Sequence, residues 1–172
     1  MRSKAFRQPP SLNRPVGFEI AAPDTVEIQI TPGAMVRWAE VREGRTVGEL
    51  EVAPFSAALI LDRDGILEEK VRGVAGATAT IPIQLPNASG FRAATVGASS
   101  APLPYLYVFA FAPLGVDGGV LVIVRSAQPS WAAADAILGS LRLLTRGGVA
   151  NDVGDTKLPL VTASSSGRRT DS

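Results

Sequence analysis

Hydrophobic and polar residues alternate along much of the first half of the chain. The run from Val26 to Ile30 places apolar residues at every second position, with Glu27 and Gln29 between them. This period of two is typical of a β-strand that buries one face. Similar runs recur over residues 16–20, 36–52 and 77–85, separated by Pro and Gly turn signals. The pattern predicts a domain built mainly from short strands.

Two nearly continuous apolar runs, Tyr105–Phe111 and Val120–Val124, follow in the second half. Runs without polar positions are typical of strands that are buried on both faces. The glycine-rich stretch from Gly115 to Gly119 lies between them, so we expect a hairpin at the centre of the fold. Pro82 predicts that the strand over residues 77–85 is an edge strand or a kinked one.

The segment after Asp62 is open to two interpretations. Asp64-Gly65 lies between two apolar runs, and Asp-Gly at such a place is a strong signal for a two-residue hairpin turn. Leu67 and Val71 are four positions apart, so a short helix over residues 66–72 is the alternative. We favour the hairpin.

A helix is predicted clearly only near the end of the chain. Ser130 is a good N-cap residue, and Trp131, Ile137, Leu138 and Leu141 recur at helical spacing. The same face continues to Leu144, and Gly147-Gly148 is a stop signal. We therefore expect a C-terminal helix that packs on the sheet.

The chain divides into three parts on this evidence. Residues 1–15 form a basic, proline-containing arm that we expect to be irregular, and residues 147–172 form a polar, Ser/Gly-rich tail. Residues 16–146 form the domain between them. The fold class we predict is α+β: an antiparallel β-sheet with a C-terminal helix packed on it, flanked by irregular N- and C-terminal extensions.

The chain contains neither histidine nor cysteine. The usual general base, the usual thiol nucleophile and the commonest transition-metal ligands are therefore missing. Asp62, Asp64 and Gly65 lack the spacing of a calcium loop. Glu49 and Glu51 share a strand face and could pair in a hydrolase, but a solvated sheet face is the favoured interpretation. We expect no enzyme activity, cofactor, bound metal or small-molecule substrate.

Positive charge is concentrated at the N-terminus, where residues 1–14 contain no acidic residue. The domain itself is mildly acidic, which argues against nucleic-acid binding. The arm could contact phosphate, anionic lipid or an acidic partner. No apolar signal segment follows the basic residues, and Pro104, Pro113 and Asp117 interrupt the most apolar region. We expect a cytoplasmic protein, or one peripheral to a membrane complex.

The residues most suited to partner binding are the arm and tail cations and the aromatic residues outside the helix. They are Arg2, Lys4, Arg7, Arg14, Trp38, Tyr105, Tyr107, Arg168 and Arg169. One hypothesis is a non-enzymatic accessory protein that docks through its extensions. The alternative is a chaperone or carrier that binds apolar segments of another protein on an aromatic sheet face, although core packing is the commoner role of such aromatics.

The second half of the chain resembles the Mog1/PsbP-like superfamily, including the DcrB-related proteins. The resemblance rests on the strands at Ser89–Arg92, Tyr105–Val108 and Gly118–Val124, followed by Pro129–Arg142, which contains Ile137-Leu138-Gly139-Ser140-Leu141. Gly17–Pro23 resembles the first strand of those proteins.

That resemblance implies an antiparallel sheet with helices packed on it. It also implies mostly non-catalytic roles, such as extrinsic photosystem subunits, a small-GTPase binder and chaperones for secreted effectors. The resulting expectation is an extrinsic subunit on a larger, possibly membrane-bound, photosystem-like assembly, with no catalytic residues to carry over.

Overall fold

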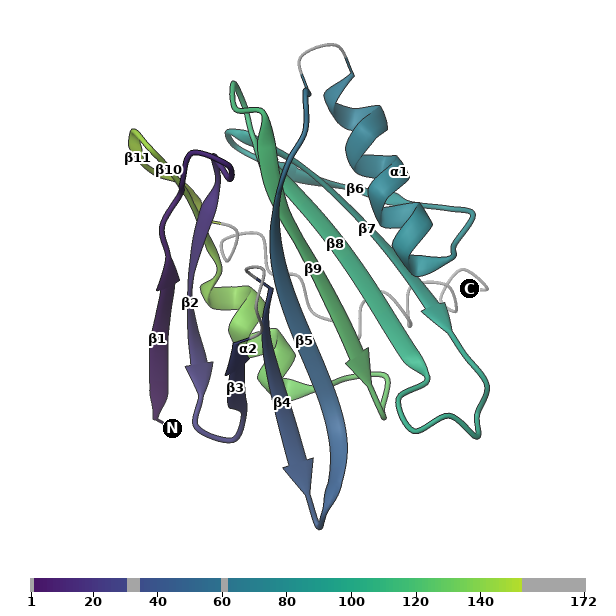
Figure 1. The fold of residues 1–172 in the computed structure, drawn as a ribbon. Coiled ribbons are helices and arrows are strands. Elements are labelled where there is room, and N and C mark those ends of the chain that lie inside the picture. Colours follow the sequence, from purple (N-terminus) through teal and green to yellow (C-terminus); the bar gives the residue numbers. More distant parts are fainter. Residues whose placement is uncertain (1, 31–34, 60–61, 153–172) are drawn as a thin grey trace.

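Two antiparallel sheets and two helices make up the part of the chain that the computed structural model describes, residues 2–30, 35–59 and 62–152 (Figure 1). The strands are β1 (Ser3–Gln8), β2 (Gly17–Pro23), β3 (Glu27–Ile30), β4 (Val36–Arg42), β5 (Arg45–Ser56), β6 (Ile81–Leu85), β7 (Ala88–Val96), β8 (Tyr105–Pro113), β9 (Gly118–Ser126), β10 (Arg142–Thr145) and β11 (Gly148–Asp152). The helices are α1 (Arg63–Ala75) and α2 (Ala132–Ser140).

The larger sheet has seven strands in the order β3-β4-β5-β9-β8-β7-β6, and the smaller sheet has four in the order β1-β2-β10-β11. All neighbouring strands run antiparallel. The α+β class and a C-terminal helix packed against a sheet are thereby confirmed. The expected β8–β9 hairpin lies inside the large sheet, and β6, which contains Pro82, is one of its two outer strands.

Each face of the large sheet is covered by a different layer. Helix α1 lies along β7 and β8 (Figure 1) and buries Leu67 and Val71 against Phe91 and Val108. On the opposite face, the small sheet and α2 form the main core with the aromatic residues of β4 and β8. Phe109 and Phe111 share that face, and their rings stack 6.3 Å apart between centroids.

Helix α1 replaces the hairpin that we expected after Asp62. The Asp62 carboxylate accepts a hydrogen bond from the Gly65 backbone N–H at 3.1 Å, so it caps the helix rather than opening a turn. Leu67 and Val71 then bury one helical face, and Gly76 ends the helix in the left-handed conformation with φ of 68°. The alternative interpretation of residues 66–72 is the correct one.

The terminal helix is shorter than the apolar spacing predicted. It ends at Ser140, and Leu141 is already extended, with ψ of 129°. Residues 142–145 instead form β10, because pairing with β2 buries Leu143 and Leu144 in the small sheet. The backbone pairing of β10 with β11 also places residues 148–152 within a sheet, so the expected start of an irregular tail at residue 147 is wrong.

The N-terminal arm is not irregular throughout, because residues 3–8 form β1. This strand pairs with β2 from Ser3↔Pro23 to Gln8↔Phe18. Its single aromatic residue, Phe6, packs edge-on against Trp38 with ring centroids 5.7 Å apart. The hydrogen-bonding edge of β2, rather than the arm's own composition, makes this segment a strand.

Strand β3 forms where the alternation predicts it but does not bury its apolar side. Ile28 and Ile30 are 42% and 69% exposed, because β3 is the outermost strand of the large sheet. No helix in the described ranges has the length and apolar character needed to cross a membrane.

Candidate binding pocket between β1 and β3

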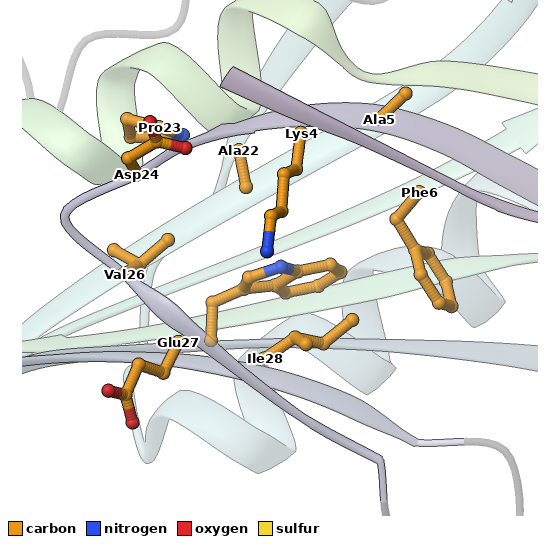
Figure 2. Close-up of a pocket in the computed structure, with 10 residues that line it drawn as sticks. Lys4, Ala5, Phe6, Ala22, Pro23, Asp24, Val26, Glu27 and Ile28 are labelled. Atoms are coloured by element: carbon orange, nitrogen blue, oxygen red, sulfur yellow. The ribbon is translucent and has the colours of Figure 1, made fainter. Parts of the chain in front are cut away.

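A cavity of about 550 Å³ lies between the outer strands of the two sheets, where β1 approaches β3. Its volume falls within the range of about 300–1,000 Å³ that is usual for ligand pockets. The lining residues come from β1, from β2 and the turn after it, and from β3 and β4 (Figure 2). They are Lys4, Ala5, Phe6, Ala22, Pro23, Asp24, Val26, Glu27, Ile28 and Trp38.

Aromatic packing holds the apolar wall of the pocket in place. Trp38 is only 2% exposed, and its ring meets Phe6 at 84° and Phe18 at 75° in edge-on contacts. Ile28 lies directly opposite Trp38 in the register of β3 and β4, so both side chains occupy the same sheet face. The wall is therefore a preformed apolar surface that continues outward onto the exposed Ile28.

Lys4 is the cation of this pocket. It lies opposite Ala22 in the small sheet, while Phe6 lies opposite Ile20, so Lys4 and Phe6 point to the same face. Figure 2 shows the Lys4 ammonium directed into the pocket, whereas the Glu27 carboxylate points away from its centre. Among the described residues, none forms a hydrogen bond or an ion pair with the Lys4 side chain.

The pocket brings together Lys4 and Trp38, two of the residues that the sequence singled out. Arg7 lies elsewhere, with its Nε 3.8 Å from Glu19 on β2. Tyr107 is buried, and its hydroxyl donates to the Pro129 carbonyl at 2.7 Å. The backbone carbonyl of Arg2 accepts from the Asp24 N–H at 3.1 Å, and its side chain is exposed.

Two more of these candidates, Arg14 and Tyr105, do not contribute to the pocket. Arg14 and Tyr105 are both half-buried, and neither lines it. Arg168 and Arg169 fall outside the described residues.

Several lining residues were not among the sequence candidates. Phe6 had a weak signal, as an apolar residue in an otherwise basic arm. The alternating pattern around Ile28 predicted that its side chain is buried, but the side chain is exposed. Ala22 had no signal, and the alternation that includes Val26 predicted only burial; the two residues line a pocket because β1 lies beside β2 and β3.

The carboxylates considered for hydrolysis lie outside this pocket. Glu51 is buried and forms ion pairs with two arginines. Its Oε1 atom lies 2.8 Å from Arg37 Nη2 and 3.8 Å from Arg125 Nη1. Glu49 is half-buried on the same strand. Across the described ranges, no three His, Cys, Asp or Glu side chains are grouped so that they could hold a metal ion. The Glu51 contacts suit an ion-pair network on a sheet face.

No family model matches this chain, and the comparisons with curated proteins and with solved structures found no match either.

Proposed function

We propose that the protein is a non-catalytic binding protein, an accessory subunit that docks on a larger assembly by taking up an apolar segment of a partner protein. The binding site is the pocket between β1 and β3. The observation that carries this proposal is the apolar lining formed by the half-buried Phe6 and the exposed Ile28, which the buried Trp38 ring supports from behind. Exposed apolar surface next to a rigid pocket is typical of protein-binding sites.

Two sequence-based hypotheses meet in this pocket. The hypothesis of docking through the basic arm included Lys4 among the binding residues. The hypothesis of capturing apolar segments on an aromatic sheet face included Trp38. Both residues line the cavity. Of the other aromatic candidates, Tyr107 is buried in the core and Tyr105 is half-buried, and neither of them lines the cavity. A carrier role and a docking role would therefore use the same site and differ in whether the complex is permanent.

A site-specific cross-linking experiment tests the proposal. A photo-reactive phenylalanine analogue, p-benzoylphenylalanine, replaces Ile28 in the full chain, which is then irradiated in its native cells. The matched control carries the analogue in place of Val96, which is also an exposed aliphatic residue on a strand but belongs to β7. We expect a discrete protein adduct from position 28 and none from position 96.

Two results would count against this function. One is the absence of any protein adduct at position 28 in a variant whose circular dichroism matches the parent chain. The other is equal adduct formation at positions 28 and 96, which would mean general surface contact rather than a site. A further Lys4→Glu change should reduce the position-28 adduct if the pocket itself is engaged.

A further inference from the structure

We propose that strand β1 is a movable wall of the pocket, which detaches from β2, admits the partner segment and closes over it again. This inference rests on the proposed function, because it names how the same site is regulated. Three observations support it: β1 is held at one edge only, a single large apolar side chain anchors it, and β2 is held in place by other contacts. The structure describes the closed state, in which Lys4 and Phe6 line the cavity.

Strand β1 is attached to the fold through one edge. It is the outer strand of the small sheet (Figure 1), and β2 is its only neighbour among the described strands. Four of its six residues are exposed, and the other two, Phe6 and Gln8, are half-buried. Few buried contacts and exposed backbone hydrogen bonds are typical of segments that open locally while the rest of the protein stays folded.

Phe6 is the only large apolar residue of the strand. Its ring centroid lies 5.7 Å from that of Phe18 and 5.7 Å from that of Trp38. A second contact is the ion pair of Arg7, whose Nε lies 3.8 Å from a Glu19 carboxylate oxygen. The Arg7 side chain is 61% exposed, and exposed ion pairs of this kind contribute little to stability. Beyond its backbone pairing, β1 is therefore anchored by one aromatic ring.

Strand β2 is held in place by contacts that do not involve β1. Phe18 and Ile20 are fully buried in the main core, and residues 17–19 pair with β10. The Ser140 hydroxyl of α2 accepts a hydrogen bond from the Ala21 N–H at 2.8 Å and lies 3.2 Å from the Ala21 carbonyl oxygen. Release of β1 would therefore leave β2 and the core behind it intact.

The closed strand covers buried residues of the pocket. Lys4 lies opposite Ala22, which is only 4% exposed, and Phe6 packs edge-on against Trp38. Detachment of β1 would expose both Ala22 and the Trp38 ring, and so widen the cavity into a groove along the edge of β2. An extended segment of a partner could enter this groove, and the return of Lys4 and Phe6 would then hold it.

Cysteine alkylation measures whether β1 opens by itself, because the chain has no native cysteine. Ala22→Cys places a thiol beneath β1, and Ala110→Cys places one at a fully buried position of β8 as the matched control. Each full-length variant is treated with iodoacetamide at the same pH and followed by mass spectrometry. We expect position 22 to react about a hundredfold faster than position 110 or more, since only global unfolding exposes the latter.

A disulfide lock tests whether the release of β1 causes that reactivity. Arg7 and Glu19 lie opposite each other on β1 and β2 and outside the pocket lining, so Arg7→Cys/Glu19→Cys can join the two strands. In the Ala22→Cys chain, the oxidised bridge should slow alkylation at position 22 by about tenfold or more. Reduction of the bridge should restore the rate.

The same lock tests whether opening controls binding. The purified chain with p-benzoylphenylalanine at position 28 and the paired cysteines is added, oxidised or reduced, to an extract of its native cells and irradiated. The adduct that is quantified is the one obtained from position 28 in intact cells. We expect the oxidised form to give about tenfold less of it, because entry of the partner requires β1 to leave.

Equal alkylation rates at positions 22 and 110, or a rate at position 22 that the bridge leaves unchanged, would show that β1 does not open by itself and would overturn the inference. Equal adduct yields from the oxidised and reduced forms would overturn it as well, because the partner then enters with β1 in place. If position 28 gives no adduct in cells or in either form, the proposed function is wrong, and the alkylation rates still decide whether β1 opens.

Discussion

Trp131 Nε1 donates a 2.8 Å hydrogen bond to Glu40 Oε1, which joins the start of α2 to β4 across 91 positions of sequence. Both side chains are buried. The second carboxylate oxygen of Glu40 accepts from Arg42 Nε at 2.6 Å. A buried carboxylate is costly unless its oxygens are hydrogen-bonded, and here both are. This hydrogen bond therefore links the layer that contains α2 and the small sheet to strand β4 of the large sheet.

Removal of this acceptor should destabilise the fold. In Glu40→Ala the indole N–H is buried without a partner, so we expect the free energy of unfolding to fall by about 1–3 kcal/mol. Glu40→Gln keeps an acceptor oxygen and should lose less. Urea unfolding followed by circular dichroism measures both. Equal losses in the two variants would mean that the charge of Glu40, rather than the hydrogen bond from Trp131, is what matters.

The Trp131 ring packs so closely against Gly48 that no larger residue fits at this position without a shift. A Cβ added there would lie 2.5 Å from the Trp131 ring, so Gly48→Ala should cost about 1–3 kcal/mol through overpacking. Gly139 is the matched control, because it lies in α2 with nothing within 4 Å of an added Cβ. Gly139→Ala should raise the stability by about 0.5–1 kcal/mol, as in other helix interiors. Thermal melts of the two variants should therefore shift in opposite directions.

Leu138 should be among the most sensitive positions of α2. It is fully buried in the main core, and Leu→Ala at such sites typically costs about 2–5 kcal/mol. That is a large share of the roughly 5–15 kcal/mol that stabilises a typical domain. Denaturant titration measures the loss. A cost below about 1 kcal/mol would show that α2 contributes little to the packing of this face.

The cap of α1 provides a local test of why this segment is helical. Asp62→Ala removes the acceptor for the Gly65 N–H and should cost about 0.5–2 kcal/mol. Asp64→Asn, in the exposed first turn, retains the cap and should cost less, since it loses only a helix-dipole interaction of about 0.3–1 kcal/mol. The opposite order of stabilities would show that the first-turn charge outweighs the cap.

Stability decides which pocket variants suit binding measurements. Trp38 packs in the core and lines the pocket at once, so Trp38→Ala should cost about 3–5 kcal/mol. Ile28→Ser changes a residue at the exposed end of the same wall and should cost about 0.5 kcal/mol or less. Chemical unfolding of both variants tests this contrast, and a costly Ile28→Ser would mean that β3 needs that side chain to stay on the sheet.

The amino-acid pattern alone determined the class of this fold, most of the large sheet and the place of its central hairpin. The alternation in β2, β4 and β5 and the apolar run Tyr105–Phe111 indicate which faces are buried, because apolar side chains are stabilised by leaving water. Pro82 likewise predicted an edge strand, because a proline has no N–H to donate to a neighbour. These features depend on residues close together in the sequence.

Tertiary structure decided what depends on distant partners. Residues 3–8 form a strand because they pair with one edge of β2. Residues 142–145 form a strand because they pair with its other edge. Ile28 is exposed only because no described strand pairs beyond β3. The pocket requires β1 and β3, from different sheets, to lie beside Trp38. A local sequence pattern does not predict contacts between distant segments, because strand pairing and burial between segments depend on how the whole chain packs.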